Sequence, residues 1–374
     1  MGRRWQARGP EPGRAGSLLR RWTYENGRGR GTVLRWLMLV ALGAVAVVPA
    51  AGQARTSAMQ ITSCGQTVTT DAVLAQDLVC AGDGIVVGAS EITIGLKGFV
   101  LRGDGGAGDF GIDNSAGFDE VTILNGVLRN FENGVAGFND ADSMTISNVV
   151  ASGNTAAGFT VDGDGAFIEF ATAAGNGSHG IEVDGDRAFV EDSHAEGNGS
   201  QGIDITGEQA QITSSTAAGN AGGGISVAGG EAFVTTSTAA GNGSDGISVQ
   251  GEKAKLKTST GSGNGEDGIA VVGGLASIQS STATGNDSYG MSVDGNKAKV
   301  KTSTAAGNSG GGIHVDGDAP AVAGNRADGN GFDGGVSDNS GLGILAEGFA
   351  TSPIGTNKAR GNDDPAECAP ASLC

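Results

Sequence analysis

The sequence has little of what fills an ordinary globular core. Its 374 residues include 12 Phe, 2 Tyr and 3 Trp, and the three Trp (Trp5, Trp22 and Trp36) all lie near the N-terminus. Large side chains are therefore too few for the broad cores that two ordinary domains would need. Proline is also scarce, with 7 residues, and no Gly-X-Y triplet repeats, which excludes collagen and a Pro-rich disordered chain. With 70 Gly, a thin core of small residues, wound repeatedly, fits this composition best.

Basic charge is scarce beyond the N-terminal segment 1–54. That segment holds nine Arg and two Glu of the chain's 23 basic and 41 acidic residues, and the remainder has a net charge of −25. A surface this acidic repels nucleic acid and anionic membranes, so neither is an expected partner.

Long hydrophobic runs are also missing, apart from WLMLVALGAVAVVPAA between Trp36 and Ala51. The basic stretch before this run and the small residues after it are typical of a secretory signal peptide. The run is short for a membrane span and no second one follows it. We therefore expect 1–54 to be an N-terminal extension and signal peptide, with an uncleaved anchor as the alternative. Once cleaved, the chain is expected to be secreted, extracellular or on the cell surface, without membrane insertion.

The chain has only four cysteines, and none lies in the repeats described below. An even number of cysteines in an exported chain indicates disulfides. We predict the pairs Cys64–Cys80 and Cys368–Cys374, because each pair is local and lies at one end of the exported part. No CxxC or Cys/His spacing indicates a metal site.

A 22-residue repeat fills the middle of the chain. Each of its first eight Asn is followed four residues later by Gly and then by an alternating apolar pair, as in GIEV, GIDI and GISV. A second alternation begins at Ala188 and its equivalents, and a third lies in SSTAAGN (214–220). Such short period-2 patterns, separated by Gly and Asn, predict three strands per repeat. The Asn stand at Asn154, Asn176, Asn198, Asn220, Asn242, Asn264, Asn286, Asn308 and Asn330.

Stacked repeats of this kind form the coils of a solenoid. Each coil pairs its backbone with its neighbours about 4.8 Å away, so equivalent residues form columns. We expect the Asn column to form an amide ladder and Gly to occupy corners where a Cβ would clash. In the coil after Asn176, we expect Ile181, Val183, Ala188 and Val190 to point inward. A period of 22 is not a multiple of six, which excludes the left-handed hexapeptide helix, and the Leu pattern of leucine-rich repeats is missing.

The repeat resembles the right-handed parallel β-helix (PbH1-type) repeats of the pectate-lyase-like superfamily, over roughly 80–362. The resemblance implies an all-β solenoid with capped ends. Because that fold carries lyases, hydrolases, epimerases, adhesins and passive scaffolds, it does not imply one activity. We expect an N-terminal cap at 55–90, the parallel β-helix at 91–345, and a final coil with a C-terminal cap at 346–374.

The end of the repeat is less regular. After Asn330 the register breaks, and NRADGN (325–330) then recurs as NKARGN (357–362), at an offset of 32 instead of 22. This offset predicts one long coil with an insertion.

Carboxylates gather on one part of the predicted surface. In the outward column of the first strand, Glu182 and Asp204 are neighbours one coil apart, about 5 Å between Cα atoms. Stacked carboxylates repel each other, so one of them has a raised pKa or the group binds a cation. The candidate residues are Asp162, His179, Glu182, Asp184, Arg187 and Asp204.

Two kinds of site are compatible with this cluster. The first is a calcium site, whose hard oxygen ligands are Asp162, Glu182, Asp184 and Asp204, and no other cofactor is expected. The second is a catalytic site, because pectate-lyase-like enzymes place Ca²⁺-binding Asp residues and a basic Arg on such a face. Its weak candidates are Glu182, Asp204, Arg187 and His179.

The catalytic motifs of the resembling enzymes are incomplete here. SHGIEVDG (178–185) resembles the polygalacturonase His motif, with Ser178 where that motif has Gly, but the Asn-Thr-Asp, Asp-Asp and Arg-x-Lys segments are missing. Arg187 follows the corner at Asp184-Gly185, so we expect it to face another side from Glu182. The simplest interpretation is that polar residues decorate a solvated strand.

Three further patterns each have a simple interpretation. DGDG (162–165) and DGD (184–186) indicate turns in preference to calcium loops. In SST (214–216) and its equivalents, hydroxyl side chains flank an inward Ser and form two outward rows along the stack. Such rows resemble the surface of ice-binding β-solenoids. Thr also suits any exposed strand, however, and lysines interrupt the rows. The outward Phe167, Phe189 and Phe233 either stack on sugars or remain scattered surface residues.

We interpret the chain as an exported, monomeric, non-catalytic β-helix scaffold that binds extracellular polysaccharide or calcium. The alternative is a polysaccharide lyase or glycoside hydrolase working at Glu182 and Asp204, and a remote alternative is an ice-binding solenoid. An open groove in which Arg187 and a His converge on these carboxylates would favour the enzyme, and a flat wall would favour the scaffold.

Overall fold

The computed structural model describes residues 58–331, 344–346, 357–362, 368–369 and 371–374. The predicted signal segment 1–54 lies outside the described residues. The chain divides into the units Met1–Arg55 and Thr56–Cys374, and the second unit carries all the structure described below. No helix within the described part is long and apolar enough to cross a membrane.

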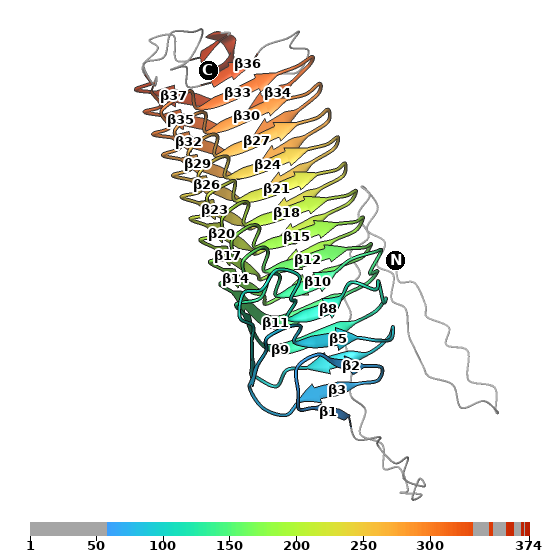
Figure 1. The fold of residues 1–374 in the computed structure, drawn as a ribbon. Helices are drawn as coiled ribbons and strands as arrows, with labels where there is room; N and C mark the ends of the chain where they lie inside the picture. The colour runs from blue at the N-terminus through green and yellow to red at the C-terminus, as the bar shows by residue number, and fades with distance from the viewer. Residues whose placement is uncertain (1–57, 332–343, 347–356, 363–367, 370) are drawn as a thin grey trace, which may run out of the picture. The chain divides into compact units, whose positions relative to one another are not determined.

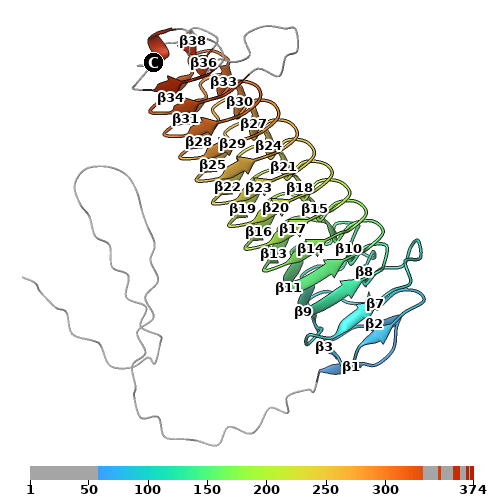
Figure 2. The same cartoon turned by 90° about the vertical axis from the view of Figure 1, so that its left-hand side faces the viewer.

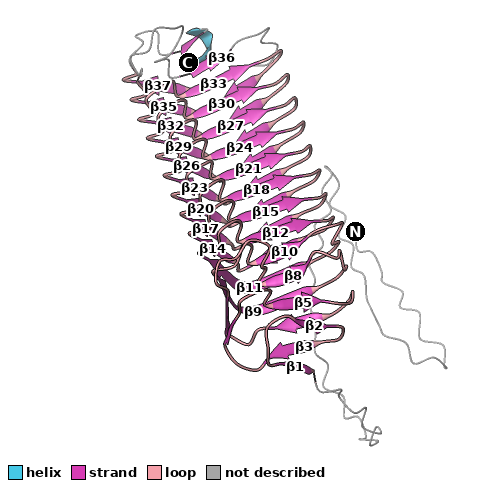
Figure 3. Cartoon of the chain, in the orientation of Figure 1, coloured by secondary structure: helices cyan, strands magenta, loops and turns pink. Residues whose placement is uncertain are grey.

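The second unit is a solenoid of parallel strands stacked along one axis (Figure 1). Turning the molecule shows the same stacking on its other sides (Figure 2). Strands and short loops make up nearly all of it (Figure 3), and the single helix among the described residues is the 3-10 turn η1 (Ala371–Leu373). The predicted right-handed parallel β-helix is therefore confirmed as an all-β parallel solenoid.

One side of the solenoid is a 14-stranded parallel sheet, formed by the first strand of each coil. Its strands, in spatial order, are β2 (Gln66–Val68), β5 (Ile85–Val87), β8 (Ile112–Asn114), β10 (Val135–Gly137), β12 (Phe159–Asp162), β15 (Ile181–Asp184), β18 (Ile203–Thr206), β21 (Ile225–Ala228), β24 (Ile247–Gln250), β27 (Ile269–Val272), β30 (Met291–Asp294), β33 (Ile313–Asp316), β36 (Ile344–Ala346) and β38 (Cys368–Ala369).

The other two strands of each coil belong to a 24-stranded sheet, because the long strands β9 and β11 run through both rows and join them. Its strands, in chain order, are β1 (Met59–Ile61), β3 (Ala72–Leu74), β4 (Leu78–Val79), β6 (Thr93–Gly95), β7 (Val100–Arg102), β9 (Thr122–Arg129), β11 (Thr145–Ser152), β13 (Phe167–Glu169), β14 (Thr172–Ala174), β16 (Phe189–Glu191), β17 (His194–Glu196), β19 (Gln211–Thr213), β20 (Thr216–Ala218), β22 (Phe233–Thr235), β23 (Thr238–Ala240), β25 (Lys255–Lys257), β26 (Thr260–Ser262), β28 (Ser277–Gln279), β29 (Thr282–Thr284), β31 (Lys299–Lys301), β32 (Thr304–Ala306), β34 (Ala321–Ala323), β35 (Arg326–Asp328) and β37 (Lys358–Arg360).

The inward side chains form a narrow core along the axis. Ile181, Val183, Ala188 and Val190 are each at most 1% exposed, as predicted from the alternation. Strand β15 pairs with β12 and β18 without any shift between equivalent positions, so Glu182 lies directly between Thr160 and Asp204. The three predicted strands per repeat and their register are therefore confirmed.

The predicted Asn ladder is also present. Asn154 donates from Nδ2 to Oδ1 of Asn176 over 2.9 Å, and Asn176 donates in the same way to Asn198 over 2.9 Å. The Nδ2 of Asn176 also bonds the carbonyl of Ala151. Because these amides are buried, each one satisfies polar groups of two coils that water does not reach.

The glycine after each ladder corner is needed for close packing between coils. A Cβ on Gly224 would lie 2.6 Å from the carbonyl oxygen of Gly246 and 2.7 Å from Cβ of Ala239. No side chain fits at that distance, which explains why this column contains Gly in eight consecutive repeats.

Both predicted disulfides are formed, Cys64–Cys80 and Cys368–Cys374. Strands of the segment 55–90, expected as a cap, pair within the same two sheets as the later coils, since β1 pairs with β3 and β2 with β5. The long final coil is present as predicted: Asn325 bonds Asn357 at a sequence separation of 32, where an ordinary coil has 22.

Candidate functional site

The outer face of the 14-stranded sheet brings together the main candidate residues. Thr160, Glu182 and Asp204 occupy one outward column on β12, β15 and β18. Thr160 accepts a 3.4 Å hydrogen bond from Asn133 and donates one of 3.4 Å to Glu182. Thr160, Glu182 and Asp204 follow the predicted register, and Asn133 joins them from the corner before β10, so these four side chains form a polar row across four coils.

His179 joins this row from the corner that precedes β15. Its Nδ1 atom lies 3.8 Å from Oδ2 of Asp204, too far for a hydrogen bond but close enough for an ion pair when the ring is protonated. The two side chains are 19% and 25% exposed. Nδ1 itself is buried and has no hydrogen-bond partner. Three of the four catalytic candidates, Glu182, Asp204 and His179, are therefore brought together.

Arg187 does not join them. It lies in the turn that follows β15, with a positive φ of 59°, and its guanidinium donates to Oδ2 of Asp164 over 2.9 Å. This ion pair agrees with the expectation that Arg187 faces a different side from Glu182. A cluster of two carboxylates and one His thus lacks the guanidinium that a lyase mechanism would use near the reacting proton.

The proposed calcium ligands lie in two pairs and not around one point. Asp162 is the register partner of Asp184, and Glu182 is the partner of Asp204. Within the described residues, no three His, Cys, Asp or Glu side chains are grouped closely enough to hold a metal ion. Calcium binding by these four residues stays a prediction, and the geometry does not add to it.

The DGDG and DGD segments have a structural role at the corners. Asp164 accepts the backbone N–H of Asp186 over 2.8 Å, and Asp186 accepts that of Glu208 over 2.7 Å. Each carboxylate therefore fixes the corner of the next coil. This agrees with the interpretation of these segments as turns.

A second acidic pair on the same side of the solenoid was not singled out from the sequence. Asp245 and Asp267 directly precede the corner glycines of consecutive coils, and Oδ1 of Asp245 accepts the N–H of Asp267 over 3.0 Å. Burial raises the pKa of Asp245 to about 6, helped by the negative charges of Asp267 and Glu266. Burial also raises the pKa of Asp267, against the opposing effects of Ser288 and His314.

Tyr289 and His314 continue the row of contacts from Asp245 and Asp267 toward the last coils. Oδ1 of Asp267 accepts the N–H of Tyr289 over 2.8 Å, and the Tyr289 ring stacks on His314 at 5.1 Å. The signal in the sequence is the column that begins with His179 and continues, at the repeat spacing, through Asp245, Asp267 and Tyr289. This column runs through the corners, whereas Glu182 and Asp204 belong to a strand column.

No loop rises beside this face along the regular coils. From 159 to 316, successive first strands begin at equal intervals of one repeat, and the corners between strands stay short throughout. Thr160, Glu182 and Asp204 therefore lie on an open wall, whereas the outward Ala136 of the preceding strand β10 is fully buried. Arg187 does not converge on these carboxylates, and the choice between a scaffold and an enzyme stays a prediction.

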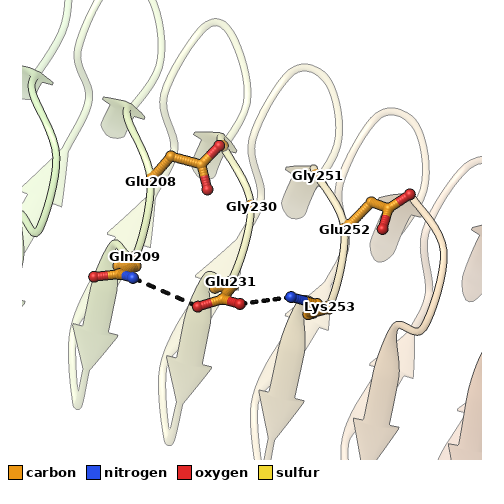
Figure 4. Close-up of a pocket in the computed structure, with 8 residues that line it drawn as sticks. Glu208, Gln209, Gly230, Glu231, Gly251, Glu252 and Lys253 are labelled. Atoms are coloured by element: carbon orange, nitrogen blue, oxygen red, sulfur yellow. Dashed lines mark hydrogen bonds and ion pairs between the residues drawn. The ribbon is translucent and has the colours of Figure 1, made fainter.

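A hollow of about 570 Å³ lies elsewhere, at the corner between the two sheets (Figure 4). Gly230 stands between Glu208 and Glu252 in its column, so the surface sinks where a side chain is missing. Gln209, Glu231 and Lys253 form a row along its edge. Glu231 accepts a hydrogen bond of 3.5 Å from Nε2 of Gln209 and one of 2.7 Å from Nζ of Lys253. The hollow contains none of the predicted catalytic or metal residues.

The outward Phe residues use their ring faces within the protein. Phe167 and Phe189 stack on each other at 5.2 Å with an interplanar angle of 12°. The amine of Lys255 lies 4.4 Å from the ring centre of Phe233. Sugar stacking on these rings, like the ice-binding alternative for the Ser and Thr rows, stays a prediction. Some of those hydroxyls bond one another, for example Ser280 and Thr302 at 3.1 Å.

The family model described as "Right handed beta helix region" matches residues 78–237 and 201–359. No curated protein matches the sequence. Among solved structures, the A-module of a mannuronan C-5 epimerase from Azotobacter vinelandii is similar at 14% identity and a TM-score of 0.46, over 80% of this chain and 83% of that one. A periplasmic alginate epimerase (13%, TM-score 0.44, 79% and 77%) and a pectate lyase (15%, TM-score 0.37, 75% and 71%) are also similar.

Proposed function

We propose, from the premise that this chain belongs to the right-handed β-helix family, that it is an exported, non-catalytic scaffold of the extracellular space or cell surface that contacts polysaccharide. The observation that carries the proposal is the open wall around Glu182 and Asp204, with Arg187 bonded to Asp164 on another side. Catalysis of polysaccharide cleavage needs acid, base and charge-stabilising groups that converge on one bond. A wall of stacked polar residues provides a surface for binding and little else.

Two further features support export and a scaffold role. The disulfides Cys64–Cys80 and Cys368–Cys374 suit an oxidising compartment. The long, uniform stack of coils provides flat lateral faces on which ligand groups can be arranged at the coil spacing of about 4.8 Å.

A second candidate function, a polysaccharide lyase or hydrolase, is favoured by one observation. His179 lies 3.8 Å from Asp204, and Glu182 is the register neighbour of Asp204, so an acid–base pair is available on one face. This candidate requires that the substrate itself bring the remaining stabilising groups, which makes it the weaker of the two.

A turnover experiment separates the two functions. The full chain and the variant Glu182→Gln/Asp204→Asn are incubated with polygalacturonate and with a neutral glucan. New double bonds are followed by ultraviolet absorbance and new chain ends by a reducing-sugar assay. We expect no product above the level of the variant. Turnover by the wild-type chain that is lost in the variant would instead establish the enzyme.

A further inference from the structure

Six lysines lie together on one part of the 24-stranded sheet. They come in two sets of three, in the segments EKAKLKT (252–258) and NKAKVKT (296–302). Within each set the lysines alternate with buried residues, for example Ala254 and Leu256 in the first. The side chains of Lys255, Lys257, Lys299 and Lys301 therefore point outward from strands β25 and β31, and Lys253 and Lys297 lie in the turns just before these strands. The six residues, here called the lysine face, are Lys253, Lys255, Lys257, Lys297, Lys299 and Lys301.

The two sets are aligned two coils apart. Lys255 pairs in register with Ser277, and Ser277 pairs with Lys299, so the coil between carries an uncharged residue at this position. In the next column Gln279 separates Lys257 from Lys301 in the same way. The two sets of lysines are therefore two coil spacings apart along the axis, about 9.6 Å. The lysine face is thus a regular array of positive charges on a flat sheet.

Most of these charges are not neutralised within the protein. Lys253 bonds Glu231 over 2.7 Å, and Lys255 lies over the ring of Phe233. The other four lysines form no ion pair with any residue that the structure describes. A cation that lacks an internal partner is available to an external anion.

The lysine face contrasts with the rest of the molecule. The chain carries a net charge of −18, and this array holds six of the 14 Lys and Arg that follow the segment 1–54. The regular strands of the 14-stranded sheet, β12 to β33, contain carboxylates and no Lys or Arg. Because the Debye length is about 8 Å at physiological salt, an anion near Lys257, Lys299 and Lys301 experiences these amines more strongly than carboxylates several coils away.

Exposed hydroxyls line the edge of the lysine face. Thr258, Ser280 and Thr302 follow the strands β25, β28 and β31 at the next corner, each with a positive φ and an exposed side chain. A row of hydroxyls beside a row of amines offers hydrogen bonds to a ligand that carries both hydroxyl and anionic groups. This combination is the chemistry of an acidic sugar chain.

We propose that the lysine face binds a linear anionic polysaccharide, whose carboxylate or sulfate groups pair with the lysines while its hydroxyls bond the Thr258–Thr302 row. The inference rests on the proposed contact with polysaccharide and assigns it to a face distinct from the Glu182 wall. Nucleic acid fits less well, because the array covers only three coils and offers no free aromatic ring for a base to stack on.

The test compares two variants with the same change in charge. In the first, Lys255, Lys257, Lys299 and Lys301 are changed to Gln. In the control, four exposed cations outside the lysine face are changed to Gln, and these are Lys97, Arg102, Arg129 and Lys358. Both are full chains, so the arginines of the segment 1–54 contribute equally. Binding to immobilised polygalacturonate, dextran sulfate and neutral dextran is measured by surface plasmon resonance.

We expect the lysine-face variant to bind both anionic polymers about tenfold more weakly than wild type, as the combined loss of four exposed ion pairs. The control should stay within about twofold of wild type, and neutral dextran should bind weakly to all three. Preference for polygalacturonate or dextran sulfate identifies carboxylate or sulfate as the ligand group.

Three results would overturn the proposal. These are equal losses in the two variants, equal binding of neutral dextran, or a single-stranded oligonucleotide bound through the same lysines as tightly as either polysaccharide. If the fourfold variant is misfolded by circular dichroism, Lys257→Gln/Lys301→Gln is compared with Lys97→Gln/Lys358→Gln. Turnover in the assay of the preceding section would refute the non-catalytic scaffold and leave the lysine comparison unaffected.

Discussion

Each ladder asparagine satisfies polar groups of two neighbouring coils. Oδ1 of Asn220 accepts the backbone N–H and the side-chain amide of Asn198 over 3.0 Å and 2.9 Å. Its Nδ2 donates to the carbonyl of Ala195 over 3.2 Å and to Asn242 over 2.9 Å. One side chain thus takes part in four buried hydrogen bonds, which is why no other residue type replaces it in the repeat.

Asn220→Ala should therefore destabilise the solenoid strongly. The substitution leaves several buried donors and acceptors without partners, and each costs about 1–3 kcal/mol, so we expect a loss of about 3 kcal/mol or more in the free energy of unfolding. Urea denaturation measures it. The control is Gln250→Ala, at the exposed end of β24, which should change stability by less than about 0.5 kcal/mol. Equal effects of the two substitutions would show that the ladder is dispensable.

Because the pKa of Asp245 is raised in the folded protein, the contribution of this carboxyl group to the free energy of unfolding depends on pH. Because the folded-state pKa, about 6, exceeds the ordinary value of 3.8, the folded protein holds this proton more tightly than the unfolded chain. The contribution is fully present below pH 3.8 and is lost as pH rises through about 6. A fully buried group with this shift would contribute about 3 kcal/mol. Solvent screening of the partly exposed carboxyl lowers that to about 1 kcal/mol.

Asp245→Asn should remove this dependence. The amide Oδ1 can still accept the N–H of Asp267, while the charge is lost, so we expect the variant to gain about 1 kcal/mol over wild type at pH 7 and little at pH 4. Urea denaturation at both pH values measures the difference. Asp287→Asn, at an exposed position of the corner, serves as the control. A gain that is the same at both pH values would contradict the assignment.

At the scale of the element, a coil consists of three short strands whose corners decide how closely the next coil approaches. Gly224 and Gly223 show the difference between two adjacent corner positions. A Cβ on Gly224 would lie 2.6 Å from a backbone oxygen of the next coil, whereas the nearest atom to a Cβ on Gly223 would be 3.2 Å away.

Gly224→Ala should cost about 2 kcal/mol in the free energy of unfolding, because the clash is with backbone that cannot move without separating two coils. Gly223→Ala should cost less than about 1 kcal/mol, since a shift of a few tenths of an ångström relieves its contact. Thermal and urea denaturation of both variants give the comparison. If Gly223→Ala proved the more damaging of the two, the corner geometry described here would be wrong.

Periodicity explains how much of this architecture could be predicted from the sequence. An alternation such as Ile181-Glu182-Val183, recurring in every repeat, has only one register that buries its apolar side chains, so strands, columns and ladder follow from it. The direction of Arg187 could be foreseen because it follows a corner. The ion pair with Asp164 could not, since it depends on the conformation of that corner.

The site was less predictable than the fold. Glu182 and Asp204 were found because they share a strand column, whose geometry the repeat dictates. The contact between His179 and Asp204, and the burial of Asp245 and Asp267, depend on how a corner folds back over the sheet. Sequence spacing alone carries no information about that.

At the scale of the whole molecule, charges of the two signs gather on different parts of the solenoid. The regular strands of the 14-stranded sheet carry carboxylates such as Glu182 and Asp294, and the 24-stranded sheet carries Glu169 and Glu191 in its earlier coils and the lysine face in its later ones. Every coil contributes to both sheets at once. A ligand that extends along the axis therefore contacts equivalent positions of successive coils, and the length of the stack sets the number of contacts.

Because each coil contacts only its neighbours, removing one whole coil should leave the fold intact. Deletion of 221–242 joins Asn220 to Gly243, so the ladder continues from Asn220 to Asn264 with no change of register. We expect a circular dichroism spectrum like that of the wild-type chain, cooperative unfolding, and a free energy of unfolding lowered by roughly the share of one coil.

Deletion of 221–231 removes half of that coil and is the control. It removes β21 and the corners on either side of it but leaves β22 and β23, so this coil cannot span the 14-stranded sheet and the variant should be unfolded or aggregated. If both deletions unfold the chain alike, the coils do not act as interchangeable units, and the stability of the solenoid depends on its unique ends.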